Sequence, residues 1–335
     1  MVAGRGARVG TATGRRAVHD VGRDHARALA PVARAQMRIG LQLPSFSYPG
    51  GTPELRPRLA EIAKAAEDAG FDSLWVMDHL FQLPEDTGWG GPDEPMLEAY
   101  STIGFLAGVT ERIRLGALVG CAMHREPGVL LKAVTTLDVL SGGRVYFTIG
   151  AGWYEREARG LGIDWPERRE RFERVEEILR LAHQAWDDDP SPFAGHHYRL
   201  AEPIIRPLPM SRPHPPIMVG GNGERRTLRL VAQYADACNF LVLEPGQVRA
   251  KLAILRQHCE RLGRDYASIE RTALDEIDLR PGRMRSGDVV ARARAQADAG
   301  IQHWIVNMPD VWDLRYLEQL GRDVIPAVAE LRAAA

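Results

Sequence analysis

Lysine is scarce in this chain of 335 residues, and long apolar runs are absent. The three lysines, Lys64, Lys132 and Lys251, all fall in segments of helical periodicity, so none stands at a strand end, where a Schiff-base enzyme needs its amine. No apolar stretch is long enough to cross a bilayer. The formal net charge of -1 shows no excess of either sign, so neither nucleic acid nor a membrane is expected as a partner.

Cysteine is equally scarce. The three cysteines, Cys121, Cys238 and Cys259, lie far apart and form no CxxC pair, so no disulfide framework is indicated and a cytoplasmic location is expected. A GxSxG elbow is absent, which argues against the acyl-transfer nucleophile of that motif. No metal is expected, because only Asp78 and His79 stand where several ligands would have to converge.

Residues 1–36 differ in composition from the rest of the chain. They contain seven arginines but only two acidic residues, Asp20 and Asp24. An arginine-rich, acid-poor start can mark an organelle transit peptide. Because the segment has no apolar periodicity to bury, we favour a disordered extension, or a start codon upstream of the true start at Met37. The predicted organisation is this extension followed by one domain over residues 37–335.

From Met37 onward, short apolar runs alternate with longer segments of helical periodicity. Eight runs are predicted as strands: Arg38–Leu43, Ser73–Met77, Ile113–Val119, Val145–Ile149, Pro216–Val219, Ala237–Val242, Ile269–Ile277 and Ile301–Asn307. The predicted helices are Leu55–Ala69, Leu97–Val109, Gly128–Leu140, Arg168–Trp186, Arg225–Tyr234, Val248–Leu262, Asp288–Ala299 and Leu314–Leu331. Most of the strands are too uniformly apolar to be half-exposed and antiparallel. Eight such units in about 300 residues predict a (β/α)8 TIM barrel, with a doubly wound open sheet as the alternative.

The longest interruption of this alternation runs over residues 150–215, after the fourth strand. It contains one helix, Arg168–Trp186, and then a proline-rich loop. Long insertions in compact domains are usually lids or binding loops. We therefore expect an insertion at the fourth unit that covers the active site.

A glycine-rich segment, Gly220-Gly221-Asn222-Gly223, follows the fifth predicted strand and precedes a helix. Active sites of such barrels lie at the carboxyl ends of the strands. Glycines let backbone N–H groups approach an anion closely, and a helix start adds a favourable dipole. The segment therefore predicts a phosphate-binding loop, although a tight strand-to-helix turn could use the same residues. The Gly150-Ala151-Gly152 turn after the fourth strand allows both interpretations as well.

Asp78 and His79 follow the second predicted strand, at the same rim. Taken singly, the aspartate could cap a turn and the histidine could be a hydrogen-bonded surface residue. Side by side at the rim, they are predicted to act in catalysis. The surrounding strand ends are glycine-rich and modestly charged, which suits a bound organic cofactor.

Several segments resemble the bacterial luciferase-like monooxygenase superfamily. They are GFDSLWVMDH at Gly70–His79, TERIRLG at Thr110–Gly116, TLDVLSGGR at Thr136–Arg144, TIGAGW at Thr148–Trp153 and PIMVGG at Pro216–Gly221. The resemblance spans Met37 to about Leu331 in order. The branch to which the chain is most similar is the one that uses the deazaflavin coenzyme F420.

This resemblance implies hydride transfer between coenzyme F420 and a small organic substrate. The cofactor ring would lie in the barrel mouth against a bulge at Leu118–Val119, where a non-proline cis peptide recurs in the family. Gly150, Ala151 and Gly152 would border the cofactor, and the loop Gly220–Gly223 would bind its phosphate. Asp78 and His79 match polar residues beside the ring, and His79 would move a proton or stabilise charge as the hydride leaves or arrives.

One position departs from the family pattern. Sugar-phosphate dehydrogenase members have a glutamate after the glycines of the fourth strand, whereas this chain has Trp153. The missing carboxylate argues against sugar-phosphate oxidation. Trp153 and Phe46, which follows the first strand, are predicted to line the substrate pocket.

Two other functions stay open at this stage. An FMN-dependent monooxygenase that uses O2 and a partner flavin reductase would share the scaffold. A non-catalytic cofactor-binding or sensor protein would have the same fold with an inactive site. Because family members are often dimers, a homodimer is a further expectation.

Overall fold

The computed structural model describes residues 36–241 and 243–334. The prediction for residues 1–36 lies outside this description except at Gln36, which forms an antiparallel bridge with Arg332. No helix in the described part of the chain is both long and apolar enough to span a membrane.

Eight parallel strands form one sheet in the order β3-β2-β1-β10-β9-β8-β7-β4. Their bounds are β1 Arg38–Leu43, β2 Ser73–Val76, β3 Arg114–Ala117, β4 Phe147–Ile149, β7 Ile217–Gly220, β8 Ala237–Leu241, β9 Glu270–Glu276 and β10 His303–Asn307. The two end strands meet through parallel bridges between Leu115 and Val145 and between Cys121 and Gly150, so the sheet closes on itself. The predicted (β/α)8 barrel is confirmed.

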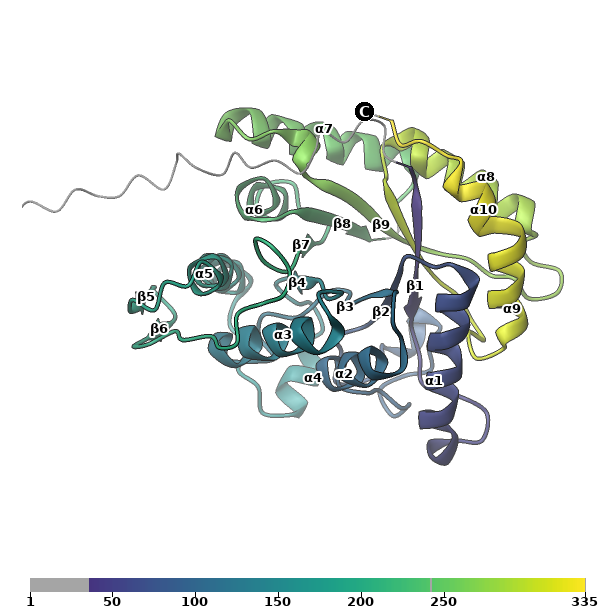
Figure 1. The fold of residues 1–335 in the computed structure, drawn as a ribbon, viewed down its shortest axis with the longest axis horizontal. Helices are drawn as coiled ribbons and strands as arrows, with labels where there is room; N and C mark the ends of the chain where they lie inside the picture. Colours follow the sequence, from purple (N-terminus) through teal and green to yellow (C-terminus); the bar gives the residue numbers. More distant parts are fainter. Residues whose placement is uncertain (1–35, 242, 335) are drawn as a thin grey trace, which may run out of the picture.

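Helices surround the strands as a ring (Figure 1). They are α1 Thr52–Ala69, α2 Ala99–Val109, α3 Pro127–Ser141, α5 Arg168–Trp186, α6 Thr227–Tyr234, α7 Pro245–Leu262 and α8 Ser286–Ala299, followed by α9 Leu314–Gln319, the π-helical turn η3 Leu320–Val324 and α10 Ile325–Ala329. Gly70 and Gly300 end α1 and α8 in the left-handed conformation, with φ of 94° and 106°. Both turns lead directly into a strand, which is the role that glycine at this position predicts.

The predicted final helix, Leu314–Leu331, is helical almost throughout but changes its hydrogen-bonding pattern in the middle. At Gly321, inside the π turn, an added Cβ would lie 2.9 Å from the Cα of Ala69. The π turn therefore packs closely against the end of α1.

Two groups of buried side chains make up the core. The larger group lies between the strands and the helices. The smaller group consists of Trp75, Leu118, Tyr146, Met218, Ala237, Leu274 and Ile305. Since these all come from strands or the residues flanking them, they form the interior layer of the barrel, which is filled with side chains as in other barrels of this size.

The segment between β4 and β7 divides into two parts. The short helix α4, Glu155–Gly160, precedes α5, which is the barrel helix of the fourth unit. After α5, β5 (Phe193–Ala194) and β6 (Arg199–Leu200) form an antiparallel hairpin. Glu177 of α5 accepts hydrogen bonds from the backbone N–H groups of His196, His197 and Tyr198, which fixes the hairpin against the helix.

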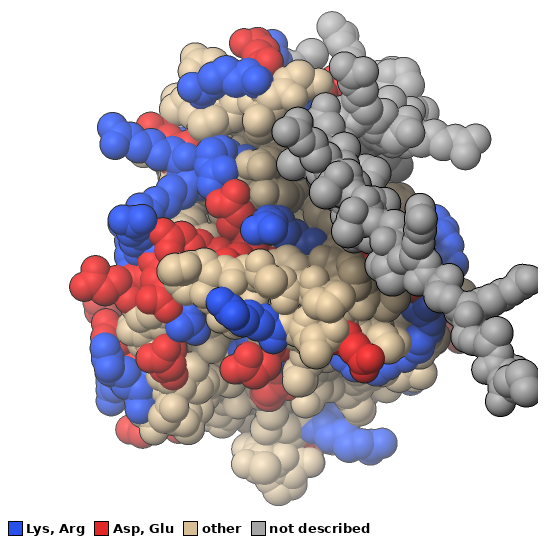
Figure 2. Space-filling view, turned by 90° about the vertical axis from the view of Figure 1, so that its left-hand side faces the viewer, with Lys and Arg blue, Asp and Glu red and all other residues tan. Residues whose placement is uncertain are grey.

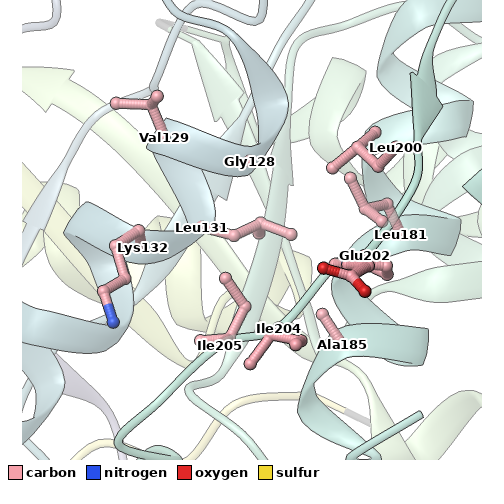
Figure 3. A pocket seen from close by; sticks show the side chains of 11 residues that line it. Gly128, Val129, Leu131, Lys132, Leu181, Ala185, Leu200, Glu202, Ile204 and Ile205 are labelled. Carbon is pink, nitrogen blue, oxygen red and sulfur yellow. The ribbon is translucent and has the colours of Figure 1, made fainter. Parts of the chain in front are cut away.

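Figure 1 shows β5 and β6 outside α5 and α3, away from the strands. The chain then passes between α3 and α5, where an apolar groove of about 290 Å³ remains on the outer flank (Figure 3). None of the predicted site residues lines this groove. The expectation that the whole insertion covers the site is therefore wrong for the hairpin, because the hairpin packs on helices instead of strand ends.

Candidate functional site

The bulge after β3 brings together residues from three neighbouring strand ends. The Leu118–Val119 peptide bond is cis, as the resemblance implied. An added Cβ on Gly220 would lie 2.5 Å from Val119 Cγ1, and one on Gly150 would lie 3.0 Å from Val119 Cγ2. Val119 therefore fits between two glycines whose missing side chains leave it room. Leu118, Val119, Gly150 and Gly220 thus meet in one place.

Hydrogen bonds from three strands fix this bulge. The Thr148 hydroxyl donates to the carbonyl of Ala117 at 2.5 Å and accepts from the N–H of Gly120 at 3.0 Å. The Gln42 side chain donates to the carbonyl of Leu118 at 3.3 Å, and Asn307 donates to Gln42 at 3.0 Å. Side chains whose partners are all backbone or other buried groups hold a loop in one conformation.

Asp78 is enclosed behind the mouth. Its carboxylate accepts two hydrogen bonds from Arg125, both at 2.8 Å, and one from the N–H of Cys121 at 2.8 Å. The Arg125 guanidinium also contacts Glu98 and lies 4.4 Å from the centroid of the Tyr100 ring. Burial alone would raise the pKa of Asp78, but the neighbouring His124 and Arg125 hold it well below its usual value. Asp78 is therefore a buried carboxylate that fixes the loop after β3.

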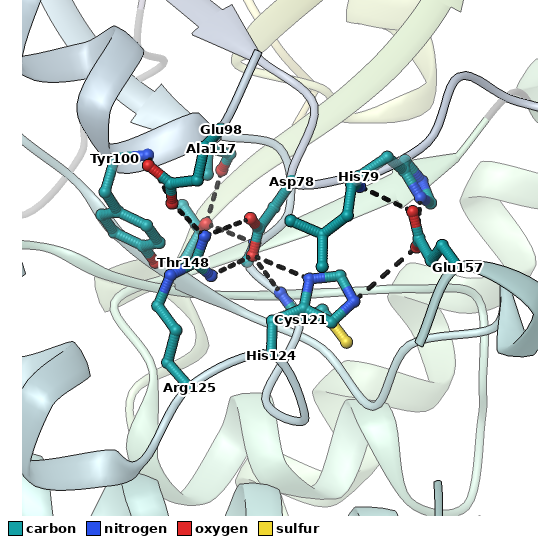
Figure 4. A network of polar contacts seen from close by, with 12 residues as sticks. Asp78, His79, Glu98, Tyr100, Ala117, Cys121, His124, Arg125, Thr148 and Glu157 are labelled. Atoms are coloured by element: carbon teal, nitrogen blue, oxygen red, sulfur yellow. Dashed lines mark hydrogen bonds and ion pairs between the residues drawn. The ribbon is translucent and has the colours of Figure 1, made fainter. Parts of the chain in front are cut away.

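His79 points away from Asp78 (Figure 4). Its Nδ1 lies 2.8 Å from Oε1 of Glu157, on α4, and its side chain is 16% exposed. Oε2 of the same glutamate accepts the backbone N–H groups of Leu80 at 2.6 Å and Phe81 at 3.1 Å. Glu157 therefore fixes both the imidazole and the loop that carries it, and Nε2 of His79 has no partner among the described residues.

The two predicted pocket residues differ sharply in exposure. Trp153 is 57% exposed and stacks on Tyr154, with ring centroids 5.2 Å apart. Both rings stand edge-on to His79, at 5.5 and 6.0 Å. Phe46 is only 1% exposed and packs against Tyr48. Trp153 is thus available to a substrate beside His79, whereas Phe46 contributes to the core behind the site.

The turn Gly150-Ala151-Gly152 follows β4 and lies next to the bulge. Gly152 has φ of 69°, and an added Cβ would lie 2.7 Å from the Cys121 sulfur. The glycine is therefore required by both backbone conformation and close packing. Of this turn, Gly150 borders Val119 directly, and Ala151 is half-buried between the two glycines.

In the loop after β7, one side chain extends the strand pairing, whereas two backbone N–H groups lack an acceptor in the described ranges. The Asn222 side chain accepts from the N–H of Leu241 and donates to its carbonyl, both at 3.0 Å, so it extends the pairing of β7 with β8. Gly221 has φ of 121° and its N–H is bound to the carbonyl of Asn239. The N–H groups of Asn222 and Gly223 have no acceptor in the described ranges. They precede α6 and remain available to an anion.

A depression of about 530 Å³ begins at Gly223 and is lined mainly by cationic side chains: Arg168, Arg169, Arg225, Arg226 and Lys251, with Glu224 and Phe172. Figure 2 shows Lys and Arg side chains gathered on this side of the molecule, interspersed with acidic ones. Glu224 pairs with Lys251 at 2.7 Å, and Glu173 with Arg169 at 2.7 Å. The remaining arginines leave positive charge beside the loop, which suits an anionic group.

Several residues of the site were not predicted from the sequence. They are Glu98, Tyr100, His124, Arg125, Thr148 and Glu157. Glu157 lies on a short helix beside Glu155, and nothing in the sequence distinguishes the two. Arg125 and His124 come only a few residues after the third predicted strand, so a longer window after each strand end includes them.

Known proteins place the chain in a family. The luciferase-like monooxygenase family matches residues 37–308. An F420-dependent glucose-6-phosphate dehydrogenase of Nakamurella multipartita is 32% identical over 240 residues, which span 70% of this chain and 65% of that protein. An FMNH(2)-dependent dimethylsulfone monooxygenase of Pseudomonas putida is 26% identical over 254 residues, or 74% of this chain and 66% of that protein.

Solved structures agree in fold. An F420-dependent secondary alcohol dehydrogenase in complex with an F420-acetone adduct superimposes with a TM-score of 0.73 at 19% identity, covering 88% of this chain and 99% of that one. Because the family match covers well over half of the chain, this protein belongs to the luciferase-like monooxygenase family.

Proposed function

We propose that this protein is an F420-dependent oxidoreductase that transfers a hydride between the cofactor and a small organic substrate. The observation that carries the proposal is His79, whose Nδ1 is fixed by Glu157 at 2.8 Å while Nε2 has no partner among the described residues and the side chain is 16% exposed. A histidine held at one nitrogen presents the other for proton transfer at a defined position. The relatives that use F420 support the choice of cofactor.

The residues at the mouth fit such a cofactor at both of its ends. Val119, half-buried between Gly150 and Gly220, offers an apolar surface for a flat ring. The N–H groups of Asn222 and Gly223, which have no acceptor in the described ranges and lie next to the cationic depression, suit a phosphate. Bound F420 would supply the hydride acceptor or donor.

The chain's own residues would handle the proton. In substrate oxidation, Nε2 of neutral His79 would accept the proton that the substrate releases, while bound F420 would accept the hydride. In substrate reduction, the protonated imidazole would return that proton. Glu157 keeps the ring oriented in both directions, and its negative charge stabilises the imidazolium form.

The substrate pocket favours an apolar or aromatic compound over a sugar phosphate. Trp153 and Tyr154 form a stacked pair beside His79, and the exposed part of Trp153 is a surface that a substrate could cover. The position after the strand-four glycines carries no carboxylate. We therefore propose that glucose 6-phosphate is not the substrate, although the relative from Nakamurella multipartita is named for it.

An FMN-dependent monooxygenase served by a separate flavin reductase is the second candidate. A phosphate site and a ring surface would serve FMN as well, and the relative from Pseudomonas putida is named for reduced FMN. The chain thus has relatives named for F420 and a relative named for reduced FMN, and a measurement of cofactor binding distinguishes the two functions.

The test is a pair of titrations of the purified chain, one with oxidised F420 and one with FMN, followed by fluorescence. We expect saturable F420 binding, and we expect FMN to compete only weakly. Tight FMN binding without F420 binding would overturn the proposal in favour of the monooxygenase. Mass measurement by light scattering on the same sample tests the homodimer, which we propose from the resemblance alone.

A further inference from the structure

His124 is a buried histidine held between two carboxylates (Figure 4). Its side chain is 1% exposed, with Nδ1 3.8 Å from Oδ2 of Asp78 and Nε2 3.7 Å from Oε1 of Glu157. These distances are too long for hydrogen bonds, and neither ring nitrogen has a hydrogen-bond partner in the described part of the chain. A buried imidazole with two orphaned nitrogens requires an explanation.

The contacts around His124 favour its charged form. Asp78 faces Nδ1, Glu157 faces Nε2, and the Cys121 thiol also lies against the ring. Arg125, the next residue along the chain, is already bound to Asp78 and Glu98. Burial alone would lower the pKa of His124, but the Asp78 carboxylate and the Cys121 thiol raise it to about 10.

Glu157 connects this imidazole to the reactive one. Its Oε1 contacts Nε2 of His124 at 3.7 Å and Nδ1 of His79 at 2.8 Å, so a single oxygen lies between the two rings. If His124 carries a positive charge, it offsets the charge of Glu157, and His79 can lose its proton at lower cost. If position 124 were neutral, His79 alone would offset the buried carboxylate and would keep its proton more tightly.

We propose that His124 is a positioning residue that sets the protonation state of His79 through their shared contact with Oε1 of Glu157. The effect on catalysis depends on the proposed function, whereas the effect of His124 on the protonation of His79 does not. During substrate oxidation His79 must be unprotonated to accept the proton, so the charge on His124 keeps the acceptor ready at lower pH.

The test is an NMR titration of the imidazole C2–H of His79 in the free protein, assigned by its loss in the His79→Gln spectrum. In His124→Phe and His124→Gln, which are both neutral, we expect the midpoint of His79 to move up by about one pH unit, a roughly tenfold gain in proton affinity. His197→Phe is the matched control, since His197 also contacts a carboxylate, Glu173 at 3.0 Å, but on the outer hairpin. It should leave the midpoint unchanged.

A second readout follows the reaction. For substrate oxidation, the acidic limb of the plot of kcat/KM against pH should shift to higher pH by the same amount in both variants. At high pH both variants should regain the wild-type rate. A merely structural role would lower the rate at every pH. If His124→Phe does not fold, as judged by circular dichroism, His124→Gln gives the same comparison.

The two proposals can fail separately. An unchanged His79 midpoint in a folded His124 variant would overturn the positioning role, whatever the cofactor. A shifted midpoint in a protein that binds no F420 would uphold the positioning role and overturn the proposed function.

Discussion

The barrel carries a cluster of charged side chains at each end, and the two clusters are built differently. The base cluster, at the amino ends of the strands, consists of Arg38, Asp72, Arg114, Tyr146, Glu270 and His303. The mouth cluster, at the carboxyl ends, consists of Asp78, His79, Glu98, His124, Arg125 and Glu157. Both contain carboxylates, arginine and histidine.

The base cluster is closed on itself. Glu270 accepts hydrogen bonds from His303 at 3.0 Å and from Tyr146 at 3.0 Å, and also contacts Arg38. The other nitrogen of His303 contacts Ser73 at 2.8 Å. In the mouth cluster, by contrast, both ring nitrogens of His124 face carboxylates at 3.7–3.8 Å without forming a hydrogen bond, and Nε2 of His79 has no partner among the described residues. A satisfied network specifies structure, whereas unsatisfied groups are typical of a reactive site.

The largest expected effect comes from removing the open imidazole. His79→Ala should lower turnover by about 10²–10⁴-fold, the usual contribution of a general acid or base, with little change in the free energy of unfolding. His196→Ala, an exposed histidine of the outer hairpin, is the control and should retain wild-type turnover. Steady-state kinetics and urea unfolding measure the two effects. Unchanged turnover in His79→Ala would show that His79 is not catalytic.

The next effect tests whether the mouth also contributes to stability. Arg125→Met leaves Asp78 enclosed without its two 2.8 Å hydrogen bonds from the guanidinium. Breaking one partner of a buried pair costs about 3–5 kcal/mol, which should appear in urea unfolding at pH 7. Arg169→Met removes an exposed arginine paired with Glu173 and should leave stability nearly unchanged. A loss in Arg125→Met no larger than this control would mean that Asp78 is solvated or neutral.

At the base, the expected effect depends on pH. Burial would raise the pKa of Glu270, but Arg38 and His303 lower it to about 2, from 4.5 for the free side chain. A lowered pKa stabilises the fold above pH 4.5, and this contribution is lost as the pH falls through about 2. Glu270→Gln should therefore cost about 3 kcal/mol at pH 7 and progressively less below pH 4.5. A difference that does not shrink in acid would contradict this account of the base cluster.

The smallest effect concerns the glycines that receive Val119. Gly220→Ala would place Cβ 2.5 Å from Val119 Cγ1 and should cost about 1–3 kcal/mol by overpacking, together with weaker cofactor binding. In Gly246→Ala, on α7, the added Cβ meets nothing within 4 Å, and this control should be neutral or slightly stabilising. Thermal unfolding with and without F420 compares them. Equal behaviour of the two variants would show that the bulge can move aside.

The arrangement of strands and helices was predictable because it depends on local pattern. Largely apolar runs such as Arg38–Leu43 and Ala237–Val242 are the strands β1 and β8 to within a residue in the described ranges. The third strand was predicted as Ile113–Val119 but ends at Ala117, because the bulge at Leu118–Val119 leaves the ladder. Apolar character continues through that bulge, so the sequence does not mark where pairing stops.

The site was predictable only at the strand ends. His79 and Gly220 were found because glycine or a polar side chain follows an apolar run. His124 was missed because it lies several residues beyond the end of β3. Glu157 was missed because its partner in the site, His79, is distant in sequence. The role of the outer hairpin was mistaken for the same reason: Glu177, which holds it against α5, looks like any other helix-surface acid.

The closure between β3 and β4 has a consequence for how the molecule responds to a ligand. Seven of the eight strand junctions are continuous ladders, whereas this one consists of isolated bridges at Leu115–Val145 and Cys121–Gly150, on either side of the bulge. A ligand bound against Val119 would contact both strands at this junction and stabilise their pairing. We therefore expect ligand binding to slow amide exchange at Gly120, Ala122 and Gly150 more than elsewhere in the sheet, so that the least continuous part of the barrel wall also reports occupancy.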